Sequence, residues 1–320
     1  MTDFKVNQIT NKEGTQGPII AGVTTVNSSS AMRIPSGGTG SAYGSGNTEV
    51  VRDESLIFHI DVKYSYNALS PSMLYDLSGN NNNSNLYGSP LPTYNSSNGG
   101  SLVFTDSNGN YGLTAINGDM LDGGPNGPYT LEFWAYPTTN DDYGTVICTG
   151  PDCWNTIGFH AGSSPATNLM YGRNGGGGNQ LIYKGGDDNK NKWQHVVQVL
   201  NNTDKGPSHT GTLEKSIEYG YSNTRHQSFP GSTETATIHY ADLYYNGVLS
   251  WIDDIGSSYQ FTDPTAFIAL CQYANIPTAG QITSSAKFTG RLGVARVYNR
   301  ALTPAEVLQN YNADKTRFGL

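Results

Sequence analysis

The sequence is poor in charged side chains. Only 14% of its 320 residues are Asp, Glu, Lys or Arg, and the net charge is -8. A protein that neutralises nucleic-acid phosphates needs a surplus of Lys and Arg, so this balance argues against a nucleic-acid partner. No apolar run is long enough to span a membrane, and the first residues lack the basic-then-apolar pattern of a signal peptide. We therefore expect a protein made in the cytoplasm, with neither nucleic acid nor membrane as its partner.

Cysteine is also scarce. The three cysteines, Cys148, Cys153 and Cys271, cannot all pair within one chain. Cys148 and Cys153 are close enough to bridge a turn, but without an export signal we expect reduced thiols. No Cys/His spacing resembles a zinc site.

Glycine (39 residues) and tyrosine (21, against 10 phenylalanines) are abundant. Glycine and asparagine suit tight turns, and aromatic side chains suit a pleated surface. Many short alternating segments with turn residues between them predict an all-β, two-sheet antiparallel β-sandwich. In one of these segments, Leu131 and Phe133 share a face. The expected strands are 56–61, 101–104, 129–137, 144–148, 156–160, 169–171, 181–183 and 193–200, then a hairpin at 242–251 that turns at Asn246-Gly247.

The end of the chain predicts a strand, a turn and one helix. Residues 291–298 have strand character, and Thr303-Pro304-Ala305-Glu306 is typical of a capping box at a helix start. The helix should run to about residue 313 and bury Leu302, Val307, Leu308 and Tyr311. We expect the strand to pair near 56–61 and the helix to cover one edge of the sandwich.

From about residue 50 to 319 the chain resembles laminin-G-like members of the concanavalin A-like lectin/glucanase superfamily. The resemblance lies, in order, in 56–61, 75–80, 99–104, 131–137, 193–200, 243–249 and 288–311. It implies a jelly-roll of two curved antiparallel sheets. Tyr-Asp-Leu-Ser-Gly-Asn at 75–80 and Val-Tyr-Asn-Arg-Ala-Leu at 297–302 also resemble virion proteins of marine bacteriophages. Residues 5–9 and 31–39 resemble the start of cyanophage structural proteins.

Catalytic residue sets are missing from the sequence. Glucanases of the superfamily carry Glu-x-Asp-x-Glu on one strand, which places the carboxylates on one face. No such triplet occurs: Glu214 and Glu218 have no acid between them, and the adjacent Asp253 and Asp254 would point to opposite faces. Gly-x-Ser-x-Gly and phosphate-binding loops are absent too, and we interpret His195 as structural. We expect no enzymatic activity.

Some relatives bind calcium at the sandwich edge through loop oxygens. Asp106, Asn108 and Asn110 alternate in a loop that could supply such ligands, as could Asp187 and Asp188. The same residues are ordinary turn formers. We assign no metal ligand and no cofactor, and Ca²⁺ is the candidate ion.

An insertion at about 201–241 departs from the family. It contains two strand-like stretches, 214–221 and 235–240, with a long tip between them, which predicts an inserted β-hairpin. Long loops in compact domains are often functional, so we interpret it as a contact surface for a neighbouring subunit or a glycan. The alternative is an insertion that only lengthens a sheet. The candidate contact residues are Tyr219, Tyr221, Arg225, His226 and Phe229.

Residues 1–48 differ in composition from 49–320, the expected sandwich. They combine weak strand character with a Gly/Ser-rich linker and cannot bury much surface alone. We expect an extended arm that docks on a partner; a disordered tail is the alternative.

These features predict a non-enzymatic structural protein on the surface of a phage particle, as a capsid decoration or a neck- or tail-associated protein. The arm would dock to other virion proteins, and the sandwich would face outward for assembly stabilisation or host-surface adhesion, as a homo-oligomer. The alternative is a lectin module that recognises cell-surface glycans.

Overall fold

The computed structural model describes residues 49–115, 128–139, 144–149, 155–161, 168–174, 179–184, 190–201, 209–212, 233–236, 240–254, 267–272 and 287–320. The predicted arm, 1–48, lies outside these residues. Within them, no helix has both the length and the apolar character needed to cross a membrane.

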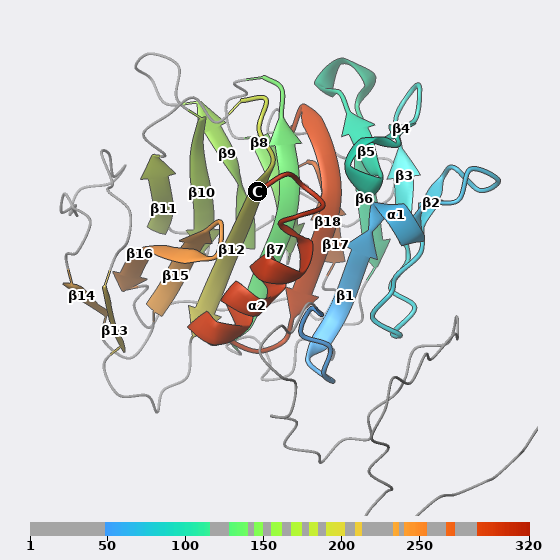
Figure 1. Cartoon of the computed structure of the whole chain (residues 1–320). Helices are drawn as coiled ribbons and strands as arrows, with labels where there is room; N and C mark the ends of the chain where they lie inside the picture. Colours follow the sequence, from blue (N-terminus) through green and yellow to red (C-terminus); the bar gives the residue numbers. More distant parts are fainter. Residues whose placement is uncertain are drawn as a thin grey trace, which may run out of the picture. The chain divides into compact units, whose positions relative to one another are not determined.

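Most of the described residues form two eight-stranded antiparallel sheets (Figure 1). In the first, sheet A, all strands but β1 form one continuous path, and β1 pairs with β18 off this path. That path is β16 (Val248–Asp254), β15 (Tyr240–Tyr245), β12 (Gln194–Asn201), β7 (Tyr129–Pro137), β18 (Gly290–Tyr298), β5 (Ser101–Phe104) and β4 (Thr93–Asn95), and β1 is Leu56–Asp61.

The second, sheet B, contains most of the strands that the sequence pattern did not predict. Its order is β11 (Asn179–Lys184), β10 (Asn168–Asn174), β9 (Asn155–Ala161), β8 (Gly144–Thr149), β17 (Phe267–Leu270), β6 (Tyr111–Ala115), β3 (Ser84–Tyr87) and β2 (Met73–Leu74). A separate ladder pairs β13 (His209–Thr212) with β14 (Thr233–Ala236). The predicted all-β, two-sheet class is therefore confirmed.

Strand β18 lies in the middle of sheet A. One edge pairs with β7 along its whole length. The other edge pairs first with β5, from Gly290 to Leu292, and then with β1, from Val294 to Tyr298. The prediction that the C-terminal strand pairs with 56–61 is confirmed.

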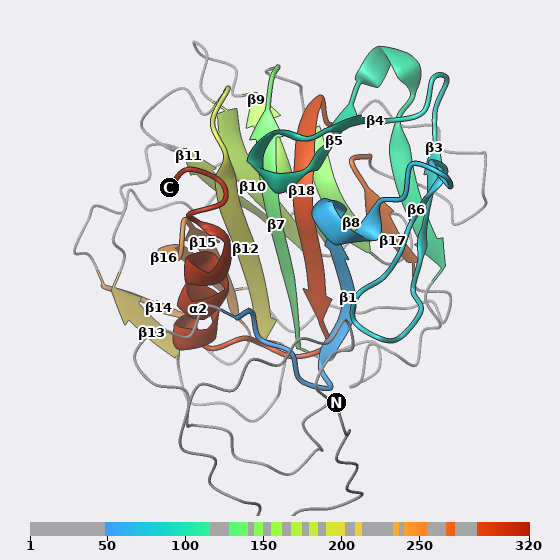
Figure 2. The same cartoon turned by 45° about the vertical axis from the view of Figure 1, so that its right-hand side comes forward.

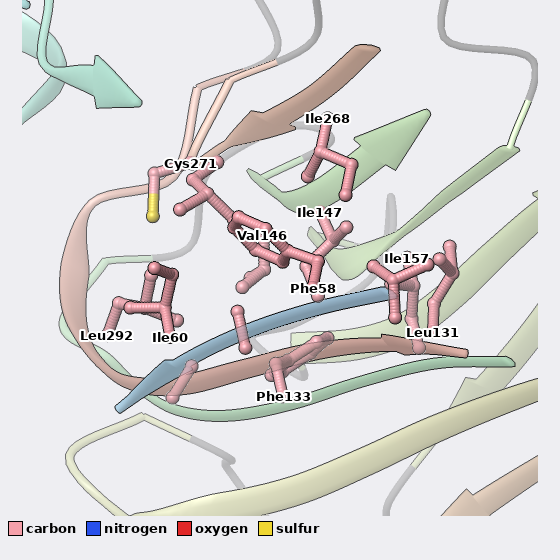
Figure 3. Packing of buried hydrophobic residues seen from close by; sticks show 14 of the residues in the cluster. Phe58, Ile60, Leu131, Phe133, Val146, Ile147, Ile157, Ile268, Cys271 and Leu292 are labelled. Atoms are coloured by element: carbon pink, nitrogen blue, oxygen red, sulfur yellow. The ribbon is translucent and has the colours of Figure 1, made fainter. Parts of the chain in front are cut away.

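The main core fills the space between the two sheets. Leu131 and Phe133 of β7 point inward, as their alternation predicts, and both are fully buried. Figure 3 shows them facing Ile157 and Ile268 from sheet B. The Phe133 ring meets Phe159 of β9 edge-on, with ring centroids 5.7 Å apart.

The free edge of β1 is covered by the loop 75–82. The Asp76 carboxylate accepts hydrogen bonds from the backbone N–H groups of His59 and Asn82, at 2.9 and 3.0 Å. The side chains of Asn80 and Asn82 donate to carbonyls of β1. The Tyr-Asp-Leu-Ser-Gly-Asn stretch thus satisfies the backbone groups that an edge strand would otherwise expose.

Two local predictions have different outcomes. The Asn246-Gly247 turn joins β15 to β16 with φ of 49° and 79°, as a type I′ hairpin requires. The cysteines were predicted to be reduced, but Cys148 is disulfide-bonded. Cys271 is a free thiol, and burial raises its pKa well above the usual value.

We predict that Phe133→Ala lowers the free energy of unfolding by about 3–5 kcal/mol, because the ring leaves a cavity between two rigid sheets. Urea unfolding followed by circular dichroism measures this loss. The matched control is Thr93→Ala on the edge strand β4, where the side chain is exposed, and it should change the value by less than about 0.5 kcal/mol. Equal losses in both variants would contradict the assigned core.

Candidate functional site

Helix α2 (Pro304–Asp314) begins with the predicted capping box. Thr303 Oγ1 accepts from the Glu306 N–H, and the Glu306 carboxylate accepts from the Thr303 N–H at 2.8 Å. The prediction that the helix covers an edge of the sandwich is wrong. The helix lies across the outer face of sheet A, in front of β12 and β7 in Figure 1 and beside β12 in Figure 2. Val307 is buried there, whereas Leu308, expected to be buried, is exposed.

A group of buried charged side chains lies between α2 and sheet A. Arg296 of β18 donates to Glu132 of β7 and to Asp314 of α2, both at 2.5 Å. His195 of β12 places Nε2 3.1 Å from Glu132 Oε1, the same oxygen that accepts from Arg296. Arg296, Glu132 and His195 are almost completely buried. We call Arg296, Glu132, Asp314, His195 and Asn310 of α2 the Glu132 network.

Charge pairing decides the protonation states in the Glu132 network. Burial alone would raise the pKa of Glu132, but the Arg296 guanidinium and the His195 hydrogen bond outweigh it and lower the pKa to about 2. Burial would likewise lower the pKa of Arg296, but Glu132 and Asp314 outweigh it and raise that pKa. The network therefore holds its ion pair at neutral pH.

Asn310 connects the network to the start of the sandwich. Its Nδ2 donates to Glu132 Oε2 at 2.6 Å and to the Tyr298 hydroxyl at 3.0 Å. Its Oδ1 accepts from the Val51 N–H at 2.7 Å, and the Tyr298 hydroxyl donates to the Val51 carbonyl. One helix residue thus fixes the chain that leads into β1.

The turn after α2 closes the same face. Arg317 donates to both carboxylate oxygens of Asp61 at 2.8 Å and to the backbone carbonyls of Asn98 and Gly100. Phe318 packs on Trp134 and Trp193, with ring centroids 4.5 Å away in both pairs. Arg296 and Tyr298, both buried and hydrogen-bonded within the fold, are thus scaffold residues.

Glu132 and Asp314 were not among the residues predicted from the sequence. A signal was present, since Glu132 and Trp134 share the face of β7 opposite Leu131 and Phe133. A tryptophan on the supposedly solvent-facing side indicates that something covers it. Because the network is enclosed, its carboxylate cannot reach a substrate, and its chemistry is structural.

The exposed apolar side chains gather elsewhere. Four of the six large exposed ones in the described ranges come from residues 64–94, namely Tyr64, Leu69, Tyr75 and Tyr94. The Tyr94 ring stacks on Tyr66 at 5.1 Å and 6° between planes. The Tyr75 N–H donates to the Ser65 carbonyl, which brings the end of β2 beside α1 (Val62–Ser65). We call Tyr64, Tyr66, Tyr75 and Tyr94 the tyrosine surface.

Polar groups next to the tyrosine surface are mostly engaged. Asp61 is bound by Arg317, and Asp76 accepts four hydrogen bonds within its own loop and from β1. Lys63 places Nζ 4.7 Å over the Tyr64 ring. The surface therefore offers flat rings with hydroxyl groups and one ammonium group, which suits contact rather than acid–base chemistry.

The predicted contact residues Tyr219, Tyr221, Arg225, His226 and Phe229 all lie outside the described residues. From the insertion at 201–241 the structure describes residue 201, the β13–β14 ladder and residues 240–241, and the predicted stretch 214–221 lies outside the described residues. Their role stays a prediction.

The structure describes the loop that carries Asp106 and Asn110, two of the calcium-ligand candidates. Asn110 uses its side chain within the fold, donating to the Pro90 carbonyl and accepting from the Thr105 N–H. Asp106 pairs with Lys287 at 2.8 Å. Across the described ranges, no group of three His, Cys, Asp or Glu residues is placed to hold a metal ion. Asp187 and Asp188 lie outside those ranges, and calcium binding stays untested.

We predict that Glu132→Gln costs about 3–5 kcal/mol at pH 7, because Arg296 keeps a buried charge with one partner fewer. The pKa of Glu132 is lower in the folded than in the unfolded chain. Its contribution is therefore present above about pH 4.5 and is lost as the pH falls toward 2. Urea unfolding at pH 7 and pH 3 should show a smaller acid loss for Glu132→Gln than for the wild type.

The control is Asp106→Asn, which removes a half-exposed ion pair and should cost less than about 1 kcal/mol. Identical acid losses in the wild type and Glu132→Gln would contradict the assigned role of Glu132.

Comparison with known proteins agrees with the fold. Residues 106–213 match the family model of the concanavalin A-like lectin/glucanases superfamily, which confirms the predicted resemblance to that superfamily. No curated protein sequence matches the chain.

Solved structures with similar folds share little sequence with this chain. Domain 4 of AbnA, a GH43 extracellular arabinanase from Geobacillus stearothermophilus, is 16% identical, with a TM-score of 0.48 over 80% of this chain and 98% of that one. The binding domain of Paraclostridial Mosquitocidal Protein 1 is 14% identical, with a TM-score of 0.49 over 81% and 52%. The botulinum neurotoxin type G receptor-binding domain is 13% identical, with a TM-score of 0.46 over 80% and 51%.

This chain thus spans about half the length of the two toxin chains. All three TM-scores are below 0.5, so nothing that those proteins bind is assigned to it. The two antiparallel sheets, the short C-terminal helix and the matching segment define a laminin-G-like, concanavalin A-like β-sandwich.

Proposed function

We propose that this chain is a non-enzymatic contact protein of a bacteriophage particle, fastened by residues 1–48 and displaying the sandwich outward. The contact role is supported by where two kinds of side chain lie, the carboxylates inside the fold and the aromatic rings on its surface. The carboxylates beside sheet A, Glu132, Asp61 and Asp314, are each bound to an arginine inside the fold. Within the described ranges, the exposed aromatic side chains, Tyr64, Tyr75 and Tyr94, all belong to the tyrosine surface.

The phage setting rests on the sequence. The stretches at 75–80 and 297–302 resemble marine phage virion proteins, and the arm is too poor in apolar residues to fold alone. Such an arm would gain order by docking to a neighbouring virion protein, for example by adding a strand to its sheet. Assembly as a homo-oligomer on the particle surface is part of the same proposal.

Deleting residues 2–48 should abolish incorporation into particles and leave a folded, soluble sandwich. Incorporation is measured by mass spectrometry of purified particles, and folding by circular dichroism of the isolated variant. A truncated protein that still enters particles would refute docking through the arm.

A second candidate function is glycan binding, and the tyrosine surface favours it. Tyrosine supplies a flat apolar face and a hydroxyl group at little conformational cost. The exposed Tyr64 ring, with the ammonium group of Lys63 over it, suits the face and hydroxyl groups of a sugar.

A glycan array separates the two candidates. If the sandwich is a lectin, the full chain should bind a subset of glycans saturably. The double variant that carries both Tyr64→Ala and Tyr94→Ala should weaken this binding at least tenfold. Leu308→Ala, an exposed apolar change on α2, is the control and should bind normally. Loss of binding in Tyr221→Ala or Arg225→Ala instead would move the site to the insertion. An array without hits would contradict the lectin candidate.

A further inference from the structure

Arg291, near the start of β18, differs from the other arginines on the outer face of sheet A. Arg296 and Arg317 each donate to a carboxylate. Among the residues that the structure describes, none offers Arg291 a carboxylate within ion-pair distance. Its guanidinium carbon Cζ lies instead 3.8 Å from the centre of the Tyr136 ring and 5.4 Å from that of Trp193. Within the described ranges, this positive charge therefore faces aromatic rings and no acid.

Arg291 belongs to a row of side chains that crosses four strands of sheet A. Its cross-strand neighbours are Tyr136 on β7 and Val103 on β5, and Val103 is opposite Thr93 on the edge strand β4. Since neighbouring strands are about 4.8 Å apart, the row extends over about 15 Å. Thr93 is exposed, and the other three side chains are partly exposed. We call Thr93, Val103, Arg291 and Tyr136 the Arg291 row.

The aromatic end of the Arg291 row is held in place by its neighbours. Trp193 meets the Tyr136 ring at 62° with the centroids 5.6 Å apart, and its Nε1 donates to Asn98 Oδ1 at 3.0 Å. Phe318 packs on the same tryptophan. Stacking on a ring uses one face of a guanidinium and leaves N–H groups at its rim free to donate. Arg291 is therefore oriented before any ligand arrives, which lowers the entropy cost of binding.

Helix α2 does not cover the Arg291 row. The row lies where β7 and β5 end and β18 begins, at the upper end of sheet A in Figure 1, whereas α2 crosses the lower part of the sheet. The C-terminal turn reaches Trp193 and Gly293 through the Phe318 ring. The exposure of Thr93 and the partial exposure of Arg291 show that this end of the face is accessible to a ligand.

The chemistry of the Arg291 row fits a ligand that carries carboxylates on apolar rings. A guanidinium binds a carboxylate through two parallel hydrogen bonds. Val103 and Tyr136 flank this charge with apolar surface, and Thr93 and Tyr136 add a hydroxyl group on either side of it. A peptide that adds to a sheet takes its affinity from the backbone groups of an edge strand, which the face of a sheet does not present. These features favour an acidic sugar chain over a peptide.

We propose that the Arg291 row is a binding site for an acidic oligosaccharide. A uronic acid carboxylate pairs with the Arg291 guanidinium, and the neighbouring sugar units lie across the strands on Val103 and Tyr136. The site is separate from the tyrosine surface and from the insertion. It names an acidic class of ligand, which the lectin candidate does not, and it requires neither the phage setting nor docking through residues 1–48.

Isothermal titration calorimetry of the full chain with oligomers of galacturonic, mannuronic and glucuronic acid tests the site. At least one oligomer should bind, and its methyl ester, which keeps the rings but loses the charge, should bind about tenfold more weakly or worse, because hydrogen bonds to a charged group are lost. Arg291→Ala should weaken binding of the acid by a similar factor. Arg291→Lys should recover only part of it, because an ammonium group cannot form the paired hydrogen bonds.

The matched control is Arg52→Ala, which removes the same charge from an exposed arginine outside the row and should bind like the wild type. Circular dichroism checks that each variant is folded. If Arg291→Ala does not fold, the comparison of the acid with its methyl ester on the wild type still decides.

Three results would overturn the proposal: no binding of any acidic oligomer, equal binding of the acid and its methyl ester, or unchanged binding in Arg291→Ala. If the double variant with Tyr64→Ala and Tyr94→Ala loses binding while Arg291→Ala keeps it, the acidic ligand occupies the tyrosine surface. That outcome would refute the site at Arg291 and leave the lectin candidate standing.

Discussion

A buried guanidinium needs carboxylates as partners, and this requirement fixes the outer layer of the sandwich. Arg296 pairs with both Glu132 on the neighbouring strand and Asp314 on the helix, and losing either carboxylate would leave buried N–H groups of the guanidinium without an acceptor. A helix held by apolar contacts could slide along a sheet at little cost. A helix held by Asp314 and Asn310 has one position, since any shift would break charged hydrogen bonds.

The sandwich therefore has two packed layers with different chemistry. The layer between the sheets is apolar and is built from alternating strand residues. The layer under α2 mixes aromatic rings with ion pairs. Together they leave the face of sheet A under α2 with little surface for a partner. In the proposed contact role, binding specificity would come from loops and connections, which is where a rigid β-scaffold commonly carries it.

Local features were predictable from the sequence. The Thr303 capping box, the Asn246-Gly247 turn and the inward side of β7 depend on residues a few positions apart, and all three were found as expected. The Glu132 network was not predictable, because Glu132 and Arg296 are 164 positions apart in the chain. Strands β6 and β17 were missed because they are short and depend on their neighbours in sheet B. The side of the sheet that α2 covers also depends on those distant partners.

The central place of β18 has a consequence for how the protein is made. Its pairing partner β1 is synthesised more than two hundred residues earlier, as the Leu56–Tyr298 pair shows, and β1 has no other ladder partner in the described residues. On the ribosome, β1 therefore has no strand to pair with until nearly all the remaining strands have emerged, and its apolar side chains stay exposed until then. Such long-range pairing makes folding slow and leaves the nascent chain open to aggregation. Sheet A can close only after synthesis has passed residue 298.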